Sequence, residues 1–188
     1  MHEIVKTFLL GSAVLTPVCL TALSVPFVLP AFRKIALPYI PATPTQLSNL
    51  SKSIEKASVN GKFLDLGSGD GTVMTALAKQ AITCDGVELN SVLHWYAKFR
   101  SLQLRNPHIG HFYRNDMFNI NLKPYDAIVI FGVPSLMPKL QQHLQLNCQP
   151  QVTVFACRFP FENTIPLFTL GENVDTVFTY RKPFVSNL

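Results

Sequence analysis

A glycine-rich turn lies at residues 63–71, which read Phe63-Leu64-Asp65-Leu66-Gly67-Ser68-Gly69-Asp70-Gly71. The short apolar run at its start is typical of a buried strand, and residues 72–80 have the pattern of a helix. Glycines between a strand and a helix allow a tight turn and let the backbone approach a ligand closely. We therefore expect a ligand to bind at this turn.

The glycine spacing and the charge of the turn indicate which class of ligand binds. A dinucleotide fingerprint, G-x-G-x-x-G, needs a glycine at position 72, which is Thr72, and the G-K-[ST] of a P-loop is missing. The spacing is D-x-G-x-G-x-G, which resembles the loop of class I S-adenosylmethionine (SAM) methyltransferases. Asp65 and Asp70 would repel a phosphate but suit an amino group or a sulfonium cation.

Two further carboxylates follow later predicted strands. Glu88 ends the second strand, 23 residues after Asp65, where an acid can accept hydrogen bonds from both hydroxyls of a ribose. Asp116 follows the third strand, where its side chain can hold the amino group of an adenine and Met117 can pack on the ring. Each of these acids alone could equally be a helix cap or a solvated turn residue, but their order at strand ends favours a nucleoside site.

Strands and helices alternate from residue 62 onward, which predicts a doubly wound α/β sheet. An earlier helix is expected over residues 45–57, and a helix capped by Ser91 over residues 91–105. The remaining predicted elements are strands at 63–66, 83–89, 111–114, 126–131 and 152–157, helices at 72–80 and 135–146, and a closing hairpin at 168–170 and 174–180.

The start of the chain carries much of its apolar excess. The chain is 48% apolar and only 14% charged, against about 25% charged residues in a typical soluble domain. Residues 7–32 contain no formal charge, and as a helix they would span roughly 39 Å, enough for a hydrocarbon core of about 30 Å. A retained membrane anchor fits this run better than a cleaved signal peptide or an Arg-rich presequence. A hairpin buried in the membrane, or a peripheral insertion, is the alternative.

The expected organisation has three parts. Residues 1–34 form the anchor and targeting segment, 35–60 a connector or lid with the first helix, and 61–188 the catalytic domain. Two cations after the apolar run against one before it favour a cytosolic or matrix location for the domain.

Other residue classes exclude several functions. The four cysteines form no C-x-x-C pair and are expected to be small buried residues. The five histidines show no metal-ligand spacing, and the basic residues form no stripe with interleaved aromatic side chains. We therefore expect neither a metal site nor nucleic-acid binding.

The chain resembles the small mitochondrial protein-lysine methyltransferases that act on the c-subunit of ATP synthase and on the adenine nucleotide translocase. The resemblance runs from about residue 25 to residue 180, and residues 25–34 look most similar to the c-subunit enzymes. The segments that carry it are Leu37–Thr43, Leu64–Gly71, Gly86–Asn90, Trp95-Tyr96, Val129–Pro134, Ala156–Phe161, Gly171-Glu172 and Asp175–Val177.

The resemblance implies a class I SAM-dependent methyltransferase with a Rossmann-like, seven-stranded, mostly parallel sheet and an N-terminal membrane helix. No metal is required, because the leaving group of the methyl transfer is a neutral thioether. The expected cofactor-binding residues are Thr43, Asp65, Gly67, Ser68, Gly69, Asp70, Gly71, Glu88, Asn90, Asp116 and Met117.

The acceptor channel is expected at the carboxyl ends of the strands. Phe131 would line it, and Arg158 would hold the SAM carboxylate or an acidic substrate group, unless it forms a surface ion pair. Tyr39 and Trp95 are candidates to surround a methylated ammonium. Ordinary helix packing for Trp95, and a stiff linker rather than a lid at residues 39–43, are the alternatives.

The function that the resemblance implies is lysine N-methylation of the ATP synthase c-subunit by an enzyme of the mitochondrial inner membrane. Its catalytic domain would face the matrix, and residues 7–32 would contact the lipid bilayer. The alternatives are another acceptor, such as the nucleotide translocase or another membrane-associated molecule, and a catalytically inactive assembly factor with a SAM fold.

Overall fold

One seven-stranded sheet forms the centre of the protein, in the order β3-β2-β1-β4-β5-β7-β6. The structure is a computed structural model and describes residues 40–184. The first five strands pair in parallel, whereas β7 is antiparallel to both β5 and β6. The strands are β1 (Phe63–Leu66), β2 (Cys84–Glu88), β3 (Ile109–Arg114), β4 (Ala127–Phe131), β5 (Thr153–Cys157), β6 (Phe168–Leu170) and β7 (Val177–Arg181).

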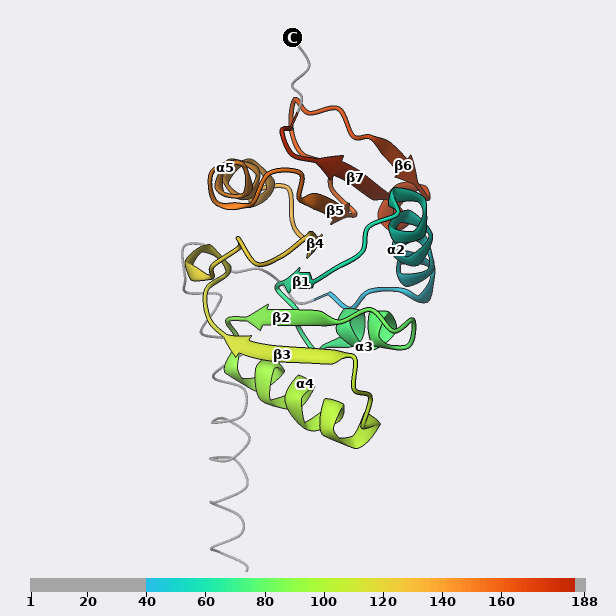
Figure 1. The fold of residues 1–188 in the computed structure, drawn as a ribbon, viewed down its shortest axis with the longest axis vertical. Helices are drawn as coiled ribbons and strands as arrows, with labels where there is room; N and C mark the ends of the chain where they lie inside the picture. Colours follow the sequence, from blue (N-terminus) through green and yellow to red (C-terminus); the bar gives the residue numbers. More distant parts are fainter. Residues whose placement is uncertain (1–39, 185–188) are drawn as a thin grey trace, which may run out of the picture. The chain divides into compact units, whose positions relative to one another are not determined.

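Helices cover both faces of the sheet, with α2 and α3 on one side and α5 on the other (Figure 1). The 3₁₀ turns η2 (Met117–Asn119) and η3 (Asn173–Asp175) lie in the loops. The helices are α2 (Pro44–Ala57), α3 (Thr72–Ala78), α4 (Ser91–Leu104) and α5 (Met137–Asn147).

The expected α/β sheet is confirmed, including its mostly parallel pairing and its closing hairpin. One local expectation is wrong, because Ser91 is the first residue of α4 and does not cap it. The cap is Asn90, whose side-chain oxygen accepts hydrogen bonds from the backbone N–H groups of Val92 (2.9 Å) and Leu93 (3.4 Å). Both residue types cap helices well, and here Asn90 is the residue with the extended backbone conformation that a cap requires.

The order of the strands places a binding site at the end of β1. The chain runs outward from β1 to β2 and β3 and then returns to β4 on the other side of β1. Ligands of open α/β sheets bind at such a reversal, outside the carboxyl ends of the strands. The glycine-rich turn follows β1 at that point.

The core on the α2 and α3 side of the sheet fixes the position of β1. Leu50 of α2 and Met74 of α3 are 1% and 0% exposed and pack with β1, β4 and β5. The rings of Phe63 and Phe155 stack across the sheet, with centroids 6.5 Å apart. Large apolar side chains that are fully buried contribute on the order of 2 kcal/mol each, so the strand before the turn is rigidly held.

The expectation for the cysteines is confirmed for the three that lie in the described residues. Cys84, Cys148 and Cys157 are buried and unpaired, and burial raises the pKa of each thiol. Cys19 lies outside the described residues. So does the segment 7–32: within residues 40–184 no helix is long and apolar enough to cross a membrane.

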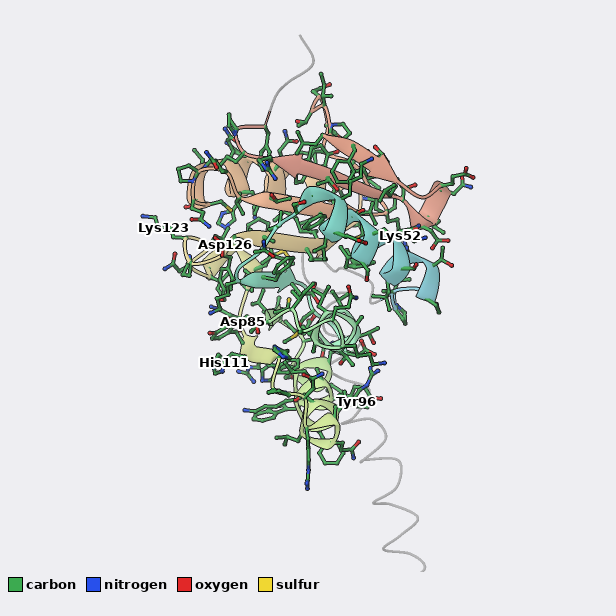
Figure 2. All side chains as sticks on the ribbon, turned by 45° about the vertical axis from the view of Figure 1, so that its right-hand side comes forward. Lys52, Asp85, Tyr96, His111, Lys123 and Asp126 are labelled. Carbon is green, nitrogen blue, oxygen red and sulfur yellow. The ribbon has the colours of Figure 1, made fainter. Side chains whose placement is uncertain are left out.

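A buried carboxylate ties the amino-terminal ends of the strands together. Asp85 is 1% exposed and accepts hydrogen bonds from the Tyr125 hydroxyl (2.9 Å) and the His111 backbone N–H (2.8 Å). Its other contact is the Lys62 ammonium at 2.7 Å. Burial alone would raise the pKa of Asp85, but these three donors together lower it. Figure 2 shows Asp85 and His111 side by side in this region.

Replacing Tyr125 with phenylalanine is expected to lower the free energy of unfolding by about 2 kcal/mol, because a hydrogen bond to a buried carboxylate is lost. The pKa of Asp85 is depressed, so its contribution is present at neutral pH and is lost as the pH falls through the folded-state value. Denaturant unfolding of Tyr125→Phe, with the exposed Tyr96→Phe as control, measures the effect. Equal stability of the two variants at pH 7 would argue against this role.

Candidate active site

The glycine-rich turn is held by hydrogen bonds to the end of β2. The backbone N–H groups of Gly67 and Ser68 both donate to the carbonyl of Val87, at 2.9 and 3.0 Å. Gly67 and Gly69 have φ angles of +83° and +54°, which glycine adopts without strain. The D-x-G-x-G-x-G spacing therefore produces a rigid turn outside the carboxyl end of β1.

Most backbone donors of the turn already have partners within the protein. The N–H of Gly69 donates to Glu88 Oε2 (2.9 Å), that of Gly71 to the carbonyl of Ser68 (2.9 Å), and that of Thr72 to Asp70 Oδ1 (3.0 Å). A phosphate needs several free N–H groups, as in a P-loop. The geometry therefore agrees with the sequence argument that this turn does not bind a phosphate.

Asp65 is a buried carboxylate beneath the turn. The residue is 1% exposed, and its Oδ2 atom is buried without a hydrogen-bond partner among the described residues. Burial, followed by the nearby carboxylates of Glu88 and Asp70, raises the pKa of Asp65 to about 8. Native proteins seldom leave a buried polar atom unpaired. A cation beside Asp65 would meet this demand, and SAM carries both a sulfonium and an ammonium group.

Glu88 lies at the end of β2 with its carboxylate fixed by the backbone. Oε1 accepts a hydrogen bond from the N–H of Asn90 (2.6 Å), and Oε2 accepts the one from Gly69. Each carboxylate oxygen has a second acceptor site, so Glu88 can still receive two ribose hydroxyls. Its predicted role stays a prediction, but the structure shows what orients the side chain.

Asp70 has structural partners that the sequence did not indicate. Its Oδ2 atom accepts a hydrogen bond from the Thr72 hydroxyl (2.8 Å) and forms an ion pair with Arg100 of α4 (3.0 Å). Together with the bond from the Thr72 N–H, these contacts engage both of its oxygens. Asp70 therefore attaches α3 to α4, its charge lies near Asp65, and its predicted contact with the cofactor stays a prediction.

The predicted adenine side of the site lies beside the turn. Asp116 caps η2, since its Oδ1 atom accepts from the N–H of Phe118 at 3.0 Å. The methyl group of Met117 lies 3.6 Å from the point where a side chain on Gly67 would begin. Ser68 is 6% exposed, and its hydroxyl has no partner within the described residues. The structure thus brings Met117 and the loop together, as a nucleoside site requires.

Thr43 begins α2 and makes contacts that hold this helix. Its hydroxyl accepts from the N–H of Gln46 (3.0 Å) and donates to Asp175 Oδ1 (2.7 Å), and the Gln46 side chain accepts from the Thr43 N–H in return. The structure therefore gives Thr43 a capping role, and its predicted contact with the cofactor stays a prediction. Tyr39 lies outside the described residues.

Two of the predicted acceptor-channel residues lie at neighbouring strand ends. Phe131 ends β4 in register with Cys157, the last residue of β5, and Arg158 follows directly. Arg158 has a φ of +79°, and its Nε atom is buried without a partner among the described residues. A non-glycine residue in this conformation often marks a functional position, so Arg158 remains a candidate for binding an anion.

Trp95 lies on the exposed side of α4, and its predicted contact with a methylated ammonium stays a prediction. Its side chain is 59% exposed on α4, and its ring contacts are with His94 (5.3 Å between centroids) and the Lys98 ammonium (5.2 Å) of the same helix. These contacts do not form a cage around a substrate amine.

The sequence reasoning missed the structural role of Gly86, although the glycine lies in a segment that carries the resemblance. A side chain at Gly86 would lie 2.8 Å from the Cβ atom of Ser68 and would also overlap Met74. Only glycine lets the turn pack this closely against β2. The charged contact of Arg100 was missed as well, because its partner lies 30 residues away in sequence.

Comparison with known proteins identifies the family. The ANTKMT methyltransferase domain matches residues 65–167. A relative from Xenopus laevis, named as the lysine N-methyltransferase of the ATP synthase c-subunit, is 46% identical over 165 residues, which cover 88% of this chain and 72% of the relative. This chain belongs to that methyltransferase family. The resemblance inferred from the sequence is thereby confirmed.

Two more comparisons place the chain within the family and the fold. The Homo sapiens protein of the same name is 39% identical over 88% of this chain and 70% of its own. The adenine nucleotide translocase lysine N-methyltransferase of Mus musculus is only 28% identical, over 80% of this chain and 67% of its own. An RNA methyltransferase from Salinibacter ruber, solved with S-adenosyl-L-homocysteine, shares the fold, with a TM-score of 0.69 at 22% identity over 77% of this chain and 94% of its own.

Proposed function

We propose that this protein is a SAM-dependent lysine N-methyltransferase that acts on the c-subunit of ATP synthase. The observation that carries the proposal is its 46% identity to a relative named for that reaction, against 28% to one named for the translocase. The site supports it, because the buried Asp65 needs a cation and the turn above it offers few donors to an anion.

SAM would supply a methyl group bonded to a sulfonium cation. Asp65 would balance the positive charge of the bound cofactor from below the turn, and its ionised form would be favoured by that charge. Glu88 would hold the ribose, with its orientation fixed by the N–H groups of Gly69 and Asn90. Met117 would pack against the adenine beside Gly67, and Asp116 would accept a hydrogen bond from the amino group of the adenine. These residues position the reactants, which is the main requirement for an in-line transfer.

The acceptor lysine must lose its proton before it attacks. An unperturbed lysine has a pKa of about 10.4, so deprotonation at pH 7 costs roughly 4 to 5 kcal/mol. A dry channel beside a sulfonium cation lowers the lysine pKa and so reduces this cost. Phe131 would exclude water at the end of β4, and the proton can leave to solvent before the lysine enters. No dedicated general base is needed.

We further propose that the enzyme is anchored in the mitochondrial inner membrane through residues 7–32, with the catalytic domain in the matrix. The uncharged run of 26 residues supports an anchor, and a membrane-bound substrate makes such an anchor useful. The translocase is the alternative acceptor rather than an additional one, because its methyltransferase is also a relative. An inactive assembly factor is not favoured, since the carboxylates and glycines of the site are present.

A reconstituted reaction tests the proposal. The full chain is incubated with SAM and detergent-solubilised c-subunit that carries no methyl groups, and the intact mass of the c-subunit is followed. We expect the mass to rise by whole methyl groups, and no rise with Glu88→Ala. Transfer to the translocase but not to the c-subunit under the same conditions would overturn the choice of substrate.

A further inference from the structure

An apolar stripe runs along the outer side of α4. It consists of Trp95, Tyr96, Phe99 and Leu102, which are 59%, 55%, 63% and 68% exposed. Their spacing places them on one side of the helix, while the buried His94 and Ala97 lie on the side that packs on the protein. Figure 2 shows Tyr96 pointing outward from this helix. Soluble proteins seldom gather so many large apolar side chains on one exposed helix, and such patches mark interaction sites.

The charged residues of the segment that carries the stripe are all basic. The 27 residues from Leu89 to Asn115 contain four Lys or Arg residues and no Asp or Glu. Lys98 and Arg105 are exposed on α4 and just after it, and Arg114 is exposed on the edge strand β3. Of these four basic residues, Arg100 alone forms an ion pair within the described part of the chain, with Asp70. This segment therefore accounts for most of the net charge of +5.

We propose that this stripe docks the catalytic domain on an anionic lipid surface. Trp and Tyr favour the boundary between headgroups and acyl chains, because they join an apolar ring to a polar tip. Phe99 and Leu102 add apolar side chains on the same side of the helix, about one and two turns beyond Trp95. Lys98 and Arg105 beside them suit anionic headgroups, and basic residues at a membrane surface contribute about 1 kcal/mol each. A protein partner would need an acidic rim to match the same surface.

Docking through α4 would also determine where the site opens. The helix begins at Ser91, three residues after Glu88, and its cap Asn90 donates to that carboxylate. Trp95 is about 7.5 Å further along the helix at 1.5 Å per residue. A lipid surface in contact with the stripe would therefore lie next to the cofactor edge of the sheet. This inference depends neither on which membrane protein is methylated nor on residues 7–32.

The protein contains one tryptophan, Trp95, so its fluorescence reports on the stripe alone. The full chain is reconstituted in phosphatidylcholine vesicles with and without phosphatidylglycerol, and quenching by lipids with brominated acyl chains is measured. We expect strong quenching with phosphatidylglycerol and weaker quenching without it. The proposal would be overturned if the protein sediments with the vesicles but brominated lipid does not quench the fluorescence of Trp95.

Two variants that keep Trp95 test the two parts of the interaction. The double variant Phe99→Ser, Leu102→Ser should lower the docked-to-undocked ratio about tenfold, because apolar contact with the lipid is lost. The double variant Lys98→Gln, Arg105→Gln should lower this ratio about fivefold for each charge removed. Leu146→Ser, at a side chain 73% exposed on α5, is the matched control and should change nothing.

Binding of SAM is measured for each variant to check that it is folded. If the apolar variant does not bind SAM, the quenching of the charge variant alone tests the proposal. Wild-type quenching in the folded variants would contradict docking through the stripe. So would a Trp95 emission that responds to protein concentration or to an oligonucleotide and not to lipid, because the stripe would then bind a second copy or a nucleic acid.

Discussion

Replacing Asp65 with asparagine is expected to abolish SAM binding and, at the same time, to stabilise the unliganded protein. The carboxylate is buried at 1% exposure, and its Oδ2 atom has no partner within the described residues. Asparagine removes the negative charge that a cationic ligand needs. It also removes the cost of ionising a buried acid beside Glu88 and Asp70. Loss of function with a gain in stability separates a binding group from a structural one.

The pH dependence of this effect has a definite sign. Burial raises the pKa of Asp65 from 3.8 to about 8. The contribution of this group to stability is therefore fully present when the pH is below the pKa of Asp65 in the unfolded chain. It is lost as the pH rises toward 8, because the unfolded chain ionises more readily. The stability difference between Asp65→Asn and the wild type should grow over this range, reaching on the order of 5 kcal/mol. In the wild type, SAM affinity should rise with pH and level off above about pH 8.

Thermal or denaturant unfolding from pH 5 to pH 9, with calorimetric titration of SAM at the same pH values, measures both effects. A stability difference that does not change with pH would show that Asp65 has an ordinary pKa. Undiminished SAM binding by Asp65→Asn would remove Asp65 from the site.

Replacing Glu88 with alanine should weaken SAM binding about a thousandfold, because two hydrogen bonds to ribose are lost at about 1.5–3 kcal/mol each. The loss includes the acceptors for the N–H groups of Gly69 and Asn90, which hold the turn against β2. Glu88→Gln keeps one oxygen acceptor but turns its NH₂ group toward the N–H group of either Gly69 or Asn90. We expect it to bind SAM with intermediate affinity.

Calorimetry distinguishes these outcomes, with the exposed Glu162→Ala as control. The control should bind SAM as the wild type does. Glu88→Ala with wild-type affinity would place the ribose elsewhere, whereas equal losses in the alanine and glutamine variants would indicate that the charge of Glu88 matters more than its hydrogen bonds.

The strands were predictable because their burial is visible in the sequence. β1 was expected at the residues where it lies, since a run of apolar side chains there meets the glycine turn. β4 and β5 are continuous buried runs of the kind that a sheet covered on both faces requires. The mostly parallel pairing followed from the alternation of strands with helices, whereas the order of the strands in the sheet came only from the structure.

Polar residues near the turn were harder to assign, because the same side chain can cap a helix or bind a ligand. Asp70 and Thr43 were both expected in the cofactor site. Their partners in the structure are Arg100 and Asp175, which lie 30 and 132 residues away in sequence. Contacts at such separation leave no periodic signal, so local pattern could not have indicated them.

The exposed side of α4 was not predictable for a similar reason. Large apolar residues at helical spacing usually face a core, and Trp95 was expected against a substrate. The structure instead turns His94 and Ala97 inward. Which side of a helix faces the sheet depends on the path of the whole chain, and the helix spacing of Trp95, Phe99 and Leu102 is the same in either case.

The mass of the ATP synthase c-subunit in a host from which this protein has been deleted tests the central claim most directly. The account predicts that the c-subunit loses the mass of its methyl groups, that wild-type protein restores it, and that Glu88→Ala does not. The mass of the nucleotide translocase should stay the same. An unchanged mass of the c-subunit in the deletion host would contradict the account.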